Sequence, residues 1–369
     1  MIYVHIPFCH RKCSYCAFYS VVVSAQLEPF TAAMCREIEQ REWHGGVVRT
    51  VYFGGGTPSL LPIDNLAAIV GALRNRFDLS SVEEATIECN PEDLTPQYLK
   101  ALLELNIFNR LSIGIQSFSN FDLKTLNRRH TAEQAIEAVE NAAHAGFSNI
   151  SIDLIYGLPG ATTEDWQHNL EIVSKLPSAV KHISAYSLTV EENTILSRQI
   201  SAGKVAVAAE EVVVEQYNVL TQWAEANGFA QYEVSNFAKA GYHSRHNSRY
   251  WTREPYIGFG PSAHSFDGYC RRWNTANLKD YVSTPQGADV PHGSEILSEA
   301  DAYNELVITS LRTTAGICKN KIPLEYRQHL CKTIKPFINS GLIRETSSCF
   351  EPTAAGLLHA DGIAVDLMV

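Results

Sequence analysis

The chain has 369 residues, of which 45% are hydrophobic and 19% are charged, and its formal net charge is −10. This length suits one large domain plus a smaller one, and the composition is typical of a globular protein. The acidic balance, without any basic block, argues against binding of nucleic acid through its phosphates. No stretch is apolar enough for a membrane span. Because the first predicted strand begins at residue 2, we expect no signal peptide and a cytoplasmic protein.

Short apolar runs alternate with helical patterns over roughly the first 190 residues. Strands are predicted at 2–6, 50–53, 85–89, 110–116, 149–155 and 182–188. The clearest helix covers 131–145, where Thr131 and Gln134 form a capping box and Gly146 stands at the position of a C′ glycine. Another helix begins near Thr163. Six strand–helix units in series predict an α/β fold with a parallel sheet, curved into a barrel or partial barrel.

The last part of the chain has a different pattern. Residues 190–290 are less regular, with one plausible helix at 209–227. Helices are then predicted at 300–312 and 332–340, a hairpin at 341–345 and 349–352, and a last helix at 354–364. Helices followed by a small hairpin are typical of a winged-helix-like α+β module, which we do not interpret as DNA-binding in so acidic a chain. We therefore predict two domains, 1–290 and 291–369.

Three cysteines, Cys9, Cys13 and Cys16, follow the first strand with the spacing C-x3-C-x2-C. Three thiolates within eight residues are costly unless a metal takes up their charge. Iron–sulfur clusters normally bind four thiolates, so a four-iron cluster here would keep one iron open to a small ligand. The alternative is a structural zinc site with a distant fourth ligand.

The other six cysteines stand singly in the sequence. We expect them to be small buried residues and not ligands: Cys35, Cys89, Cys270, Cys318, Cys331 and Cys349. With no leader expected, nine cysteines predict a reducing compartment.

Polar residues follow several predicted strands. The second strand ends in Gly54-Gly55-Gly56-Thr57, where backbone amides can approach a ligand closely. Glu88, Gln116 and Asp153 lie at the ends of later strands. In a parallel barrel these ends meet at one mouth, and a carboxylate there is costly unless it is paired or used. The alternative for each residue is a capped turn or a satisfied buried polar group.

The cysteine motif resembles that of the radical S-adenosylmethionine (SAM) superfamily. Tyr3-Val-His-Ile-Pro-Phe-Cys9 is similar to the branch that holds oxygen-independent coproporphyrinogen III oxidase and the HemW heme chaperones. The resemblance covers essentially the whole chain and implies a partial (β/α)6 barrel of the TIM type. It also implies a [4Fe–4S] cluster on Cys9, Cys13 and Cys16 whose open iron binds SAM, and reductive cleavage of SAM to a 5′-deoxyadenosyl radical.

The resemblance implies SAM contacts from residues after several strands. They are Tyr3, Gly55, Gly56, Thr57, Glu88, Gln116, Arg128 and Asp153. Acids and amides suit an ammonium group and a ribose, and an arginine suits a carboxylate. For Arg128, a solvated surface pair with Arg129 is the competing interpretation.

Three features favour the HemW side of the branch. Position 18 is Phe, where the oxidase carries a further cysteine, and we expect no counterpart of the oxidase's N-terminal extension before Cys9. The third is His246-Asn-Ser-Arg-Tyr250-Trp251, which fits the H-N-x-x-Y-W motif associated with HemW and heme. Imidazole is a common axial ligand of heme iron, and aromatic rings can pack on a porphyrin.

The resemblance thus implies a heme site. Its residues are His246, Tyr250, Trp251 and His264. The alternative for His246 is a structural histidine bonded within a loop, and His243 and His264 are rival ligands.

Three functions follow, and they come from two classes, a chaperone and an enzyme. The first is a heme chaperone that binds the cluster, SAM and heme, and delivers heme to apo-hemoproteins such as respiratory cytochromes; no catalytic residue is then assigned. The alternative is an anaerobic coproporphyrinogen III oxidase of porphyrin biosynthesis, and a third is a radical enzyme on an unrelated substrate. A homodimer and transient docking on a membrane or partner stay open.

Overall fold

A computed structural model describes residues 1–23 and 26–369. Its largest element is a nine-stranded sheet in the order β11-β1-β4-β5-β6-β7-β8-β10-β9. Six strands form its parallel centre: β1 (Ile2–Ile6), β4 (Thr50–Gly55), β5 (Glu84–Cys89), β6 (Arg110–Gln116), β7 (Ile150–Tyr156) and β8 (Val180–Ser187). All six predicted strands are therefore confirmed, with bounds that differ by one or two residues.

Three shorter strands complete the two edges of the sheet. The strand β11 (Ile257–Phe259) pairs parallel to β1, while β10 (Asn236–Ala238) pairs antiparallel to β8 and to β9 (Ala230–Glu233). Across the described ranges, β9 and β11 have no ladder between them, so the sheet stays open. The expected partial barrel is confirmed.

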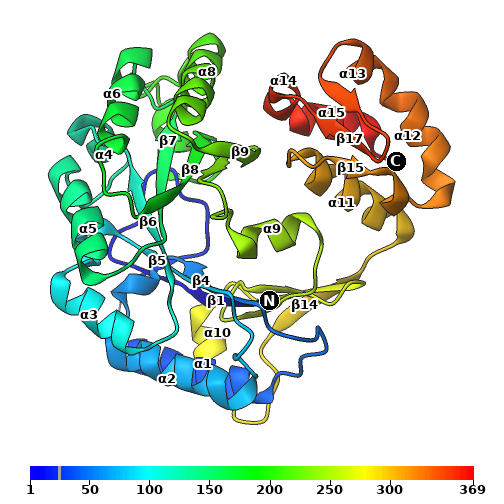
Figure 1. The fold of residues 1–369 in the computed structure, drawn as a ribbon. Helices are drawn as coiled ribbons and strands as arrows, with labels where there is room; N and C mark the ends of the chain where they lie inside the picture. The colour runs from blue at the N-terminus through cyan, green and yellow to red at the C-terminus, as the bar shows by residue number, and fades with distance from the viewer. Residues whose placement is uncertain (24–25) are drawn as a thin grey trace.

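Helices from the connections cover the outer side of the curved sheet, as Figure 1 shows for α2, α3, α5 and α6. Their bounds are α1 (Leu27–Gln40), α2 (Ile63–Arg76), α3 (Pro96–Glu104), α4 (Asn120–Thr125), α5 (Ala132–Ala145), α6 (Thr163–Val173), α7 (Ile195–Ser201) and α8 (Glu210–Ala226). The helix α5 begins at the predicted capping box of Thr131 and Gln134. It ends at Gly146, whose φ of 115° is easy only for a residue without Cβ.

The alternation of side chains along the strands separates the core from the site. In β6, Leu111, Ile113 and Ile115 are fully buried among the apolar side chains of the core. The alternate positions Ser112, Gly114 and Gln116 line a cavity on the other face. Because successive strand residues point to opposite faces, one strand supplies both the core and the cavity wall.

A smaller three-stranded sheet and two helices follow the barrel strands. They are α9 (Arg245–Trp251), β12 (His264–Phe266), β13 (Cys270–Asn274), α10 (Leu278–Ser283) and β14 (His292–Ile296). Figure 1 shows α9 between the large sheet and the C-terminal elements. Two arginines connect this region to the C-terminal elements. Arg253, just after α9, forms an ion pair with Glu305 at 3.1 Å, and Arg312 lies over the ring of Trp251 in α9.

The C-terminal elements have an apolar core of their own, whose buried members all lie between Tyr303 and Leu367. They are α11 (Glu299–Leu311), β15 (Ile317–Cys318), α12 (Arg327–Thr333), α13 (Lys335–Asn339), β16 (Ile343–Glu345), β17 (Cys349–Pro352), α14 (Ala354–Leu358) and α15 (Ala360–Leu367). The predicted hairpin is confirmed as β16 and β17, and β15 adds a third strand. The predicted domain boundary at 290 stays a prediction.

Two predicted helices are wrong in extent. The segment 332–340 is divided at Ile334 between α12 and α13, because Pro336 has no N–H to continue the helical ladder. The segment 354–364 is divided at His359. Within the part of the chain that the structure describes, no helix is both long and apolar enough to cross a bilayer.

The expectation for the single cysteines also needs correction. Of the six, Cys89 alone is buried, and Cys331 is exposed. Cys318 and Cys349 are not isolated, since their sulfur atoms lie 3.2 Å apart. Sequence distance concealed this pairing, because the two residues come from different strands of the same small sheet.

Candidate functional site

A cavity of about 660 Å³ opens at the carboxyl ends of the parallel strands. Cys9, Cys13 and Cys16 all line it. So do seven of the eight residues predicted to contact SAM: Gly55, Gly56, Thr57, Glu88, Gln116, Arg128 and Asp153. The topology therefore brings together side chains from residue 9 to residue 153. Tyr3 is the exception and lies outside the lining.

The cysteine loop is held from outside by the segment that precedes α5. The Arg11 guanidinium donates to the carbonyls of Asn127 and Arg128, at 3.1 and 2.5 Å. The Ser14 amide donates to Leu126 O at 3.0 Å, and the Asn127 side chain donates to Lys12 O at 2.8 Å. These bonds tie the cysteine loop to residues 126–128 through the protein's own groups.

The three thiols are half-buried, and two of them have polar neighbours. Thr57 Oγ1 lies 3.6 Å from Cys9 Sγ, and Arg128 Nη1 lies 3.5 Å from Cys13 Sγ. Burial raises the pKa of the Cys9 and Cys16 thiols. Thiolates here are therefore costly unless bound iron takes up their charge. Three thiols facing one cavity fit the ligand set of a cluster with one open iron.

The alternative from the sequence is that these residues bind a single metal ion such as zinc. Among residues 1–23 and 26–369, no three His, Cys, Asp or Glu side chains are grouped closely enough to hold one metal ion.

Two half-buried carboxyl groups, Glu88 and Asp153, line the cavity and accept hydrogen bonds from hydroxyl and amide donors. Tyr52 OH donates to Glu88 Oε1 at 2.8 Å, and the Gly55 amide donates to Glu88 Oε2 at 3.1 Å. Burial raises the pKa of Glu88 to about 7, although both hydrogen bonds oppose this shift. Burial likewise raises the pKa of Asp153, which accepts a bond from Ser112 at 3.3 Å. Both groups are thus costly as free anions and suited to a cationic or hydroxyl-bearing ligand.

Arg128 points into the cavity and not to solvent. Its Nη2 donates to Asn90 Oδ1 at 2.7 Å and to Gly114 O at 2.5 Å. Its Nε is buried without a hydrogen-bond partner among the described residues. This geometry differs from a solvated pair with Arg129, which is exposed. A half-buried guanidinium whose Nε donor is unused suits a carboxylate ligand.

Backbone geometry at the cavity restricts which residues fit. Gly55 has φ of 113°, and a Cβ there would lie 2.7 Å from the His5 ring. A Cβ at Gly56 would lie 2.7 Å from Phe8 O. Gln116 has φ of 72° without being glycine, at the point where the register between β6 and β7 shifts. Such irregularities re-aim side chains and cluster at ligand sites.

Two tyrosines form a layer behind Glu88. Tyr3 stacks on Tyr52 with ring centroids 6.2 Å apart, and its hydroxyl is hydrogen-bonded to His5 Nδ1 at 3.2 Å. Neither tyrosine lines the cavity, so the predicted contact of Tyr3 with SAM stays a prediction.

Sequence reasoning missed several residues of the cavity. They include Asn90, Ser112, Gly114 and Tyr186. The period of two along β6 offered a signal for Ser112 and Gly114, since both share a face with Gln116. Asn90 follows Glu88 by two residues, which is the same signal. For Tyr186 the sequence offered only its place near the end of the last parallel strand.

The H-N-x-x-Y-W motif forms most of α9, and its histidine is packed inside the protein. His246 is 1% exposed. Its Nδ1 is hydrogen-bonded to Thr50 Oγ1 at 2.9 Å, and its Nε2 to Tyr250 OH at 3.0 Å. The ring also packs against Tyr52, with centroids 5.1 Å apart. Burial lowers the pKa of His246 to about 3, so the ring is neutral. Both ring nitrogens are engaged in this structure.

The rival histidines lie on other elements and are accessible. His264 is exposed on β12, and its ring stacks on Trp273 with centroids 6.1 Å apart. His243 is exposed before α9 and stacks on Tyr232 at 4.2 Å. Burial of part of each ring lowers the pKa of both side chains, so both imidazoles are neutral near pH 7 and have a nitrogen lone pair for a metal.

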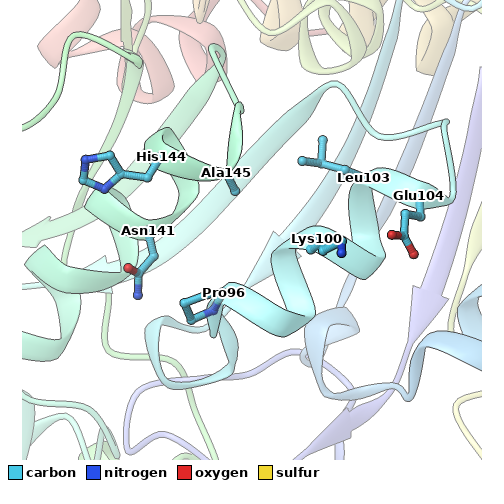
Figure 2. Close-up of a pocket in the computed structure, with 7 residues that line it drawn as sticks. All are labelled: Pro96, Lys100, Leu103, Glu104, Asn141, His144 and Ala145. Atoms are coloured by element: carbon cyan, nitrogen blue, oxygen red, sulfur yellow. The ribbon is translucent and has the colours of Figure 1, made fainter.

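A second hollow lies on the helical side, between α3 and α5 (Figure 2). Its lining contains none of the predicted site residues: Pro96, Lys100, Leu103, Glu104, Asn141, His144 and Ala145. In parallel α/β folds, ligands bind at the carboxyl ends of the strands. We therefore assign the candidate site to the cysteine-lined cavity.

Comparison with known proteins agrees with this geometry. Residues 3–173 match the family model of the radical SAM superfamily, and residues 297–359 match that of the HemN C-terminal domain. The structure superimposes on coproporphyrinogen III oxidase (HemN) from Escherichia coli, a radical SAM enzyme, with a TM-score of 0.85. That match covers 100% of this chain and 89% of the other at 24% identity. Fold and site together define a radical SAM protein with a HemN-type C-terminal domain.

Curated relatives narrow the class. The chain is 33% identical to the heme chaperone HemW of Bacillus subtilis over 96% of both chains. It is 32% identical to HemW of Mycobacterium tuberculosis over 100% of this chain and 94% of the relative. It is 37% identical to the mitochondrial radical S-adenosyl methionine domain-containing protein 1 of Danio rerio, over 86% and 73%. The chain belongs to the HemW family of heme chaperones.

Proposed function

We propose that this protein holds a [4Fe–4S] cluster and SAM in the cysteine-lined cavity, binds heme, and delivers that heme to apo-hemoproteins such as respiratory cytochromes. The observation that carries the proposal is the single cavity shared by three thiols, two half-buried carboxyl groups and a half-buried arginine. Membership of the HemW family supports the heme part.

Cys9, Cys13 and Cys16 would bind three irons and keep the fourth open. When bound and reduced, such a cluster supplies the electron that cleaves SAM. The protein's part is to hold the ligand: Arg128 faces the cavity with an unused Nε donor for a carboxylate. Glu88 and Asp153 offer acceptors for ammonium or ribose hydroxyl groups. The crowded Gly55-Gly56 turn keeps that wall free of side chains.

His246 and His264, the two candidate heme ligands, differ in their accessibility. His246 can bind iron only after one ring nitrogen gives up its hydrogen bond, to Thr50 or to Tyr250, and after α9 moves to expose the ring. His264 needs no such change, and the Trp273 ring that stacks on it would hold the imidazole in a fixed orientation. We therefore propose His264 as the first iron ligand, with His246 reached only by an opened α9.

Anaerobic heme retention tests this assignment. The reconstituted protein receives one equivalent of hemin and passes a desalting column, in parallel with His246→Ala and His264→Ala. Loss of heme in His264→Ala with retention in His246→Ala supports the accessible ligand. Loss only in His246→Ala, in a preparation that circular dichroism shows to be folded, overturns it. Equal retention in both variants would move the ligand elsewhere, with His243 the next to test.

Transfer tests the chaperone itself. The heme-loaded protein should activate an apo-cytochrome more effectively than the same concentration of free hemin. No gain over free hemin would contradict the chaperone. The decisive observation for the alternative is SAM-dependent release of carbon dioxide from coproporphyrinogen III under anaerobic conditions, which would make this chain an oxidase.

A further inference from the structure

Two cysteines outside the proposed cluster site face each other in the C-terminal sheet. Cys318 ends β15 and Cys349 begins β17, and the two are direct partners in the antiparallel ladder. They are 31 positions apart in the chain, yet their sulfur atoms lie 3.2 Å apart. Both side chains are half-buried, so small thiol reagents can reach them.

The register places this pair where cross-strand side chains come closest. The neighbouring pair is joined by a ladder bond, because the Lys319 amide donates to Ser348 O at 2.8 Å. Hydrogen-bonded and non-hydrogen-bonded pairs alternate along an antiparallel ladder. Cys318 and Cys349 therefore form a non-hydrogen-bonded pair, whose Cα atoms are close and whose side chains point to the same face. This is the backbone spacing that a disulfide requires.

We propose that Cys318 and Cys349 form a reversible cross-strand disulfide, with a low-molecular-weight disulfide such as oxidised glutathione as the oxidant. One thiolate attacks the sulfur–sulfur bond of oxidised glutathione and releases one glutathione. The second thiolate then attacks the mixed disulfide and releases the other. The two protein thiols lose two electrons and two protons, and one molecule of oxidised glutathione becomes two thiols.

The disulfide would close a ring that contains α12, α13 and β16. These elements carry part of the C-terminal core, including Leu330, Ile334 and Ile343. Cross-linking β15 to β17 removes open conformations of this ring, so the oxidised domain opens less often. In a reducing compartment such a bond is transient and reports the redox state of the cell. This inference does not rest on heme, SAM or the cluster.

The test uses the full-length, cluster-reconstituted protein under anaerobic conditions with a defined ratio of oxidised to reduced glutathione. Proteolytic digestion and mass spectrometry should detect a peptide pair that joins Cys318 to Cys349 and has lost two hydrogens. In Cys318→Ser, Cys349 should carry a stable glutathione adduct instead, and Cys349→Ser should give the converse. Cys331→Ser is the matched control, because Cys331 is exposed and has no cysteine partner in the described ranges.

The contrary result is equally clear. Separate glutathione adducts on Cys318 and Cys349 of the wild type, or no reaction at either while Cys331 reacts, would overturn the proposal. Limited proteolysis adds an independent readout: cleavage within 319–348 should slow about tenfold on oxidation, and reduction should restore it. The Cys318→Ser/Cys349→Ser double variant should show no such change. Equal cleavage of oxidised and reduced wild type would refute the constraint on the domain.

Discussion

The cysteine-lined cavity and the helix α9 differ in how the polar side chains predicted to bind ligands are hydrogen-bonded. At the cavity, Arg128 keeps an unused Nε donor, and Gln116 adopts a strained backbone conformation. In α9, both ring nitrogens of His246 are bonded to neighbouring side chains, and its backbone amide donates to Glu84 at 2.9 Å. The Arg128 guanidinium thus keeps a donor for a ligand, whereas the His246 imidazole is fully hydrogen-bonded within the protein. A sequence motif can therefore predict which segment belongs to a site, but it does not predict whether its side chains are accessible to a ligand.

The largest expected effect concerns the cavity. The triple variant Cys9→Ala/Cys13→Ala/Cys16→Ala should lose the iron–sulfide absorbance completely, since it removes every proposed protein ligand of the cluster. Thermal unfolding of the metal-free protein should change little, because the loop is held by bonds from Arg11, Ser14 and Asn127. Cys331→Ala serves as the control and should reconstitute normally. Normal reconstitution of the triple variant would show that the cavity is not the cluster site.

The second effect concerns α9. His246→Ala should lower the free energy of unfolding by about 2–4 kcal/mol, because it leaves a cavity and unpaired buried hydroxyl groups. His264→Ala should change it by less than about 0.5 kcal/mol, since that side chain is exposed. Urea denaturation of both variants measures the difference. Equal stability of the two would mean that His246 is not packed as described, and the contrast between the regions would disappear.

The third effect is a pH dependence at the cavity. The pKa of Glu88 is raised to about 7 by burial. Because this group binds its proton more tightly in the folded state, its stabilising effect is present at pH 5 and is lost as the pH rises through 7. Glu88→Gln should therefore gain about 1–3 kcal/mol relative to wild type between pH 5 and pH 8. Denaturation of the cluster-free proteins at both pH values checks this. A difference independent of pH would refute the raised pKa.

The smallest expected effect concerns Tyr52, which contacts residues of both the cavity and α9. Tyr52 donates to Glu88 at 2.8 Å and packs against His246, so it connects the cavity with α9. Tyr52→Phe should keep the packing and lose the hydrogen bond, which we expect to weaken SAM binding about fivefold. Calorimetric titration of the reconstituted protein measures the affinity, and Tyr3→Phe is the matched control in the same layer. Unchanged affinity in Tyr52→Phe would mean that the two regions act independently.

Several features were predictable because they depend on local sequence. Alternating apolar runs predicted the six parallel strands, and the Thr131 capping box predicted the start of α5. In a parallel sheet, the carboxyl ends of all strands lie at the same edge. Glu88, Gln116 and Asp153 were therefore expected at one mouth before the structure was known, and all three line the cavity.

Other features depend on which distant segments come into contact, and only the tertiary structure decided them. Burial of His246 requires Thr50, 196 positions away, and the contact between Cys318 and Cys349 requires the register of β15 on β17. Tyr3 lies outside the cavity lining and stacks on Tyr52. Periodicity and spacing in the sequence predict the strands and helices, and the strand ends at which a ligand site can form. The partners of a buried polar group depend on packing between elements, which no local pattern encodes.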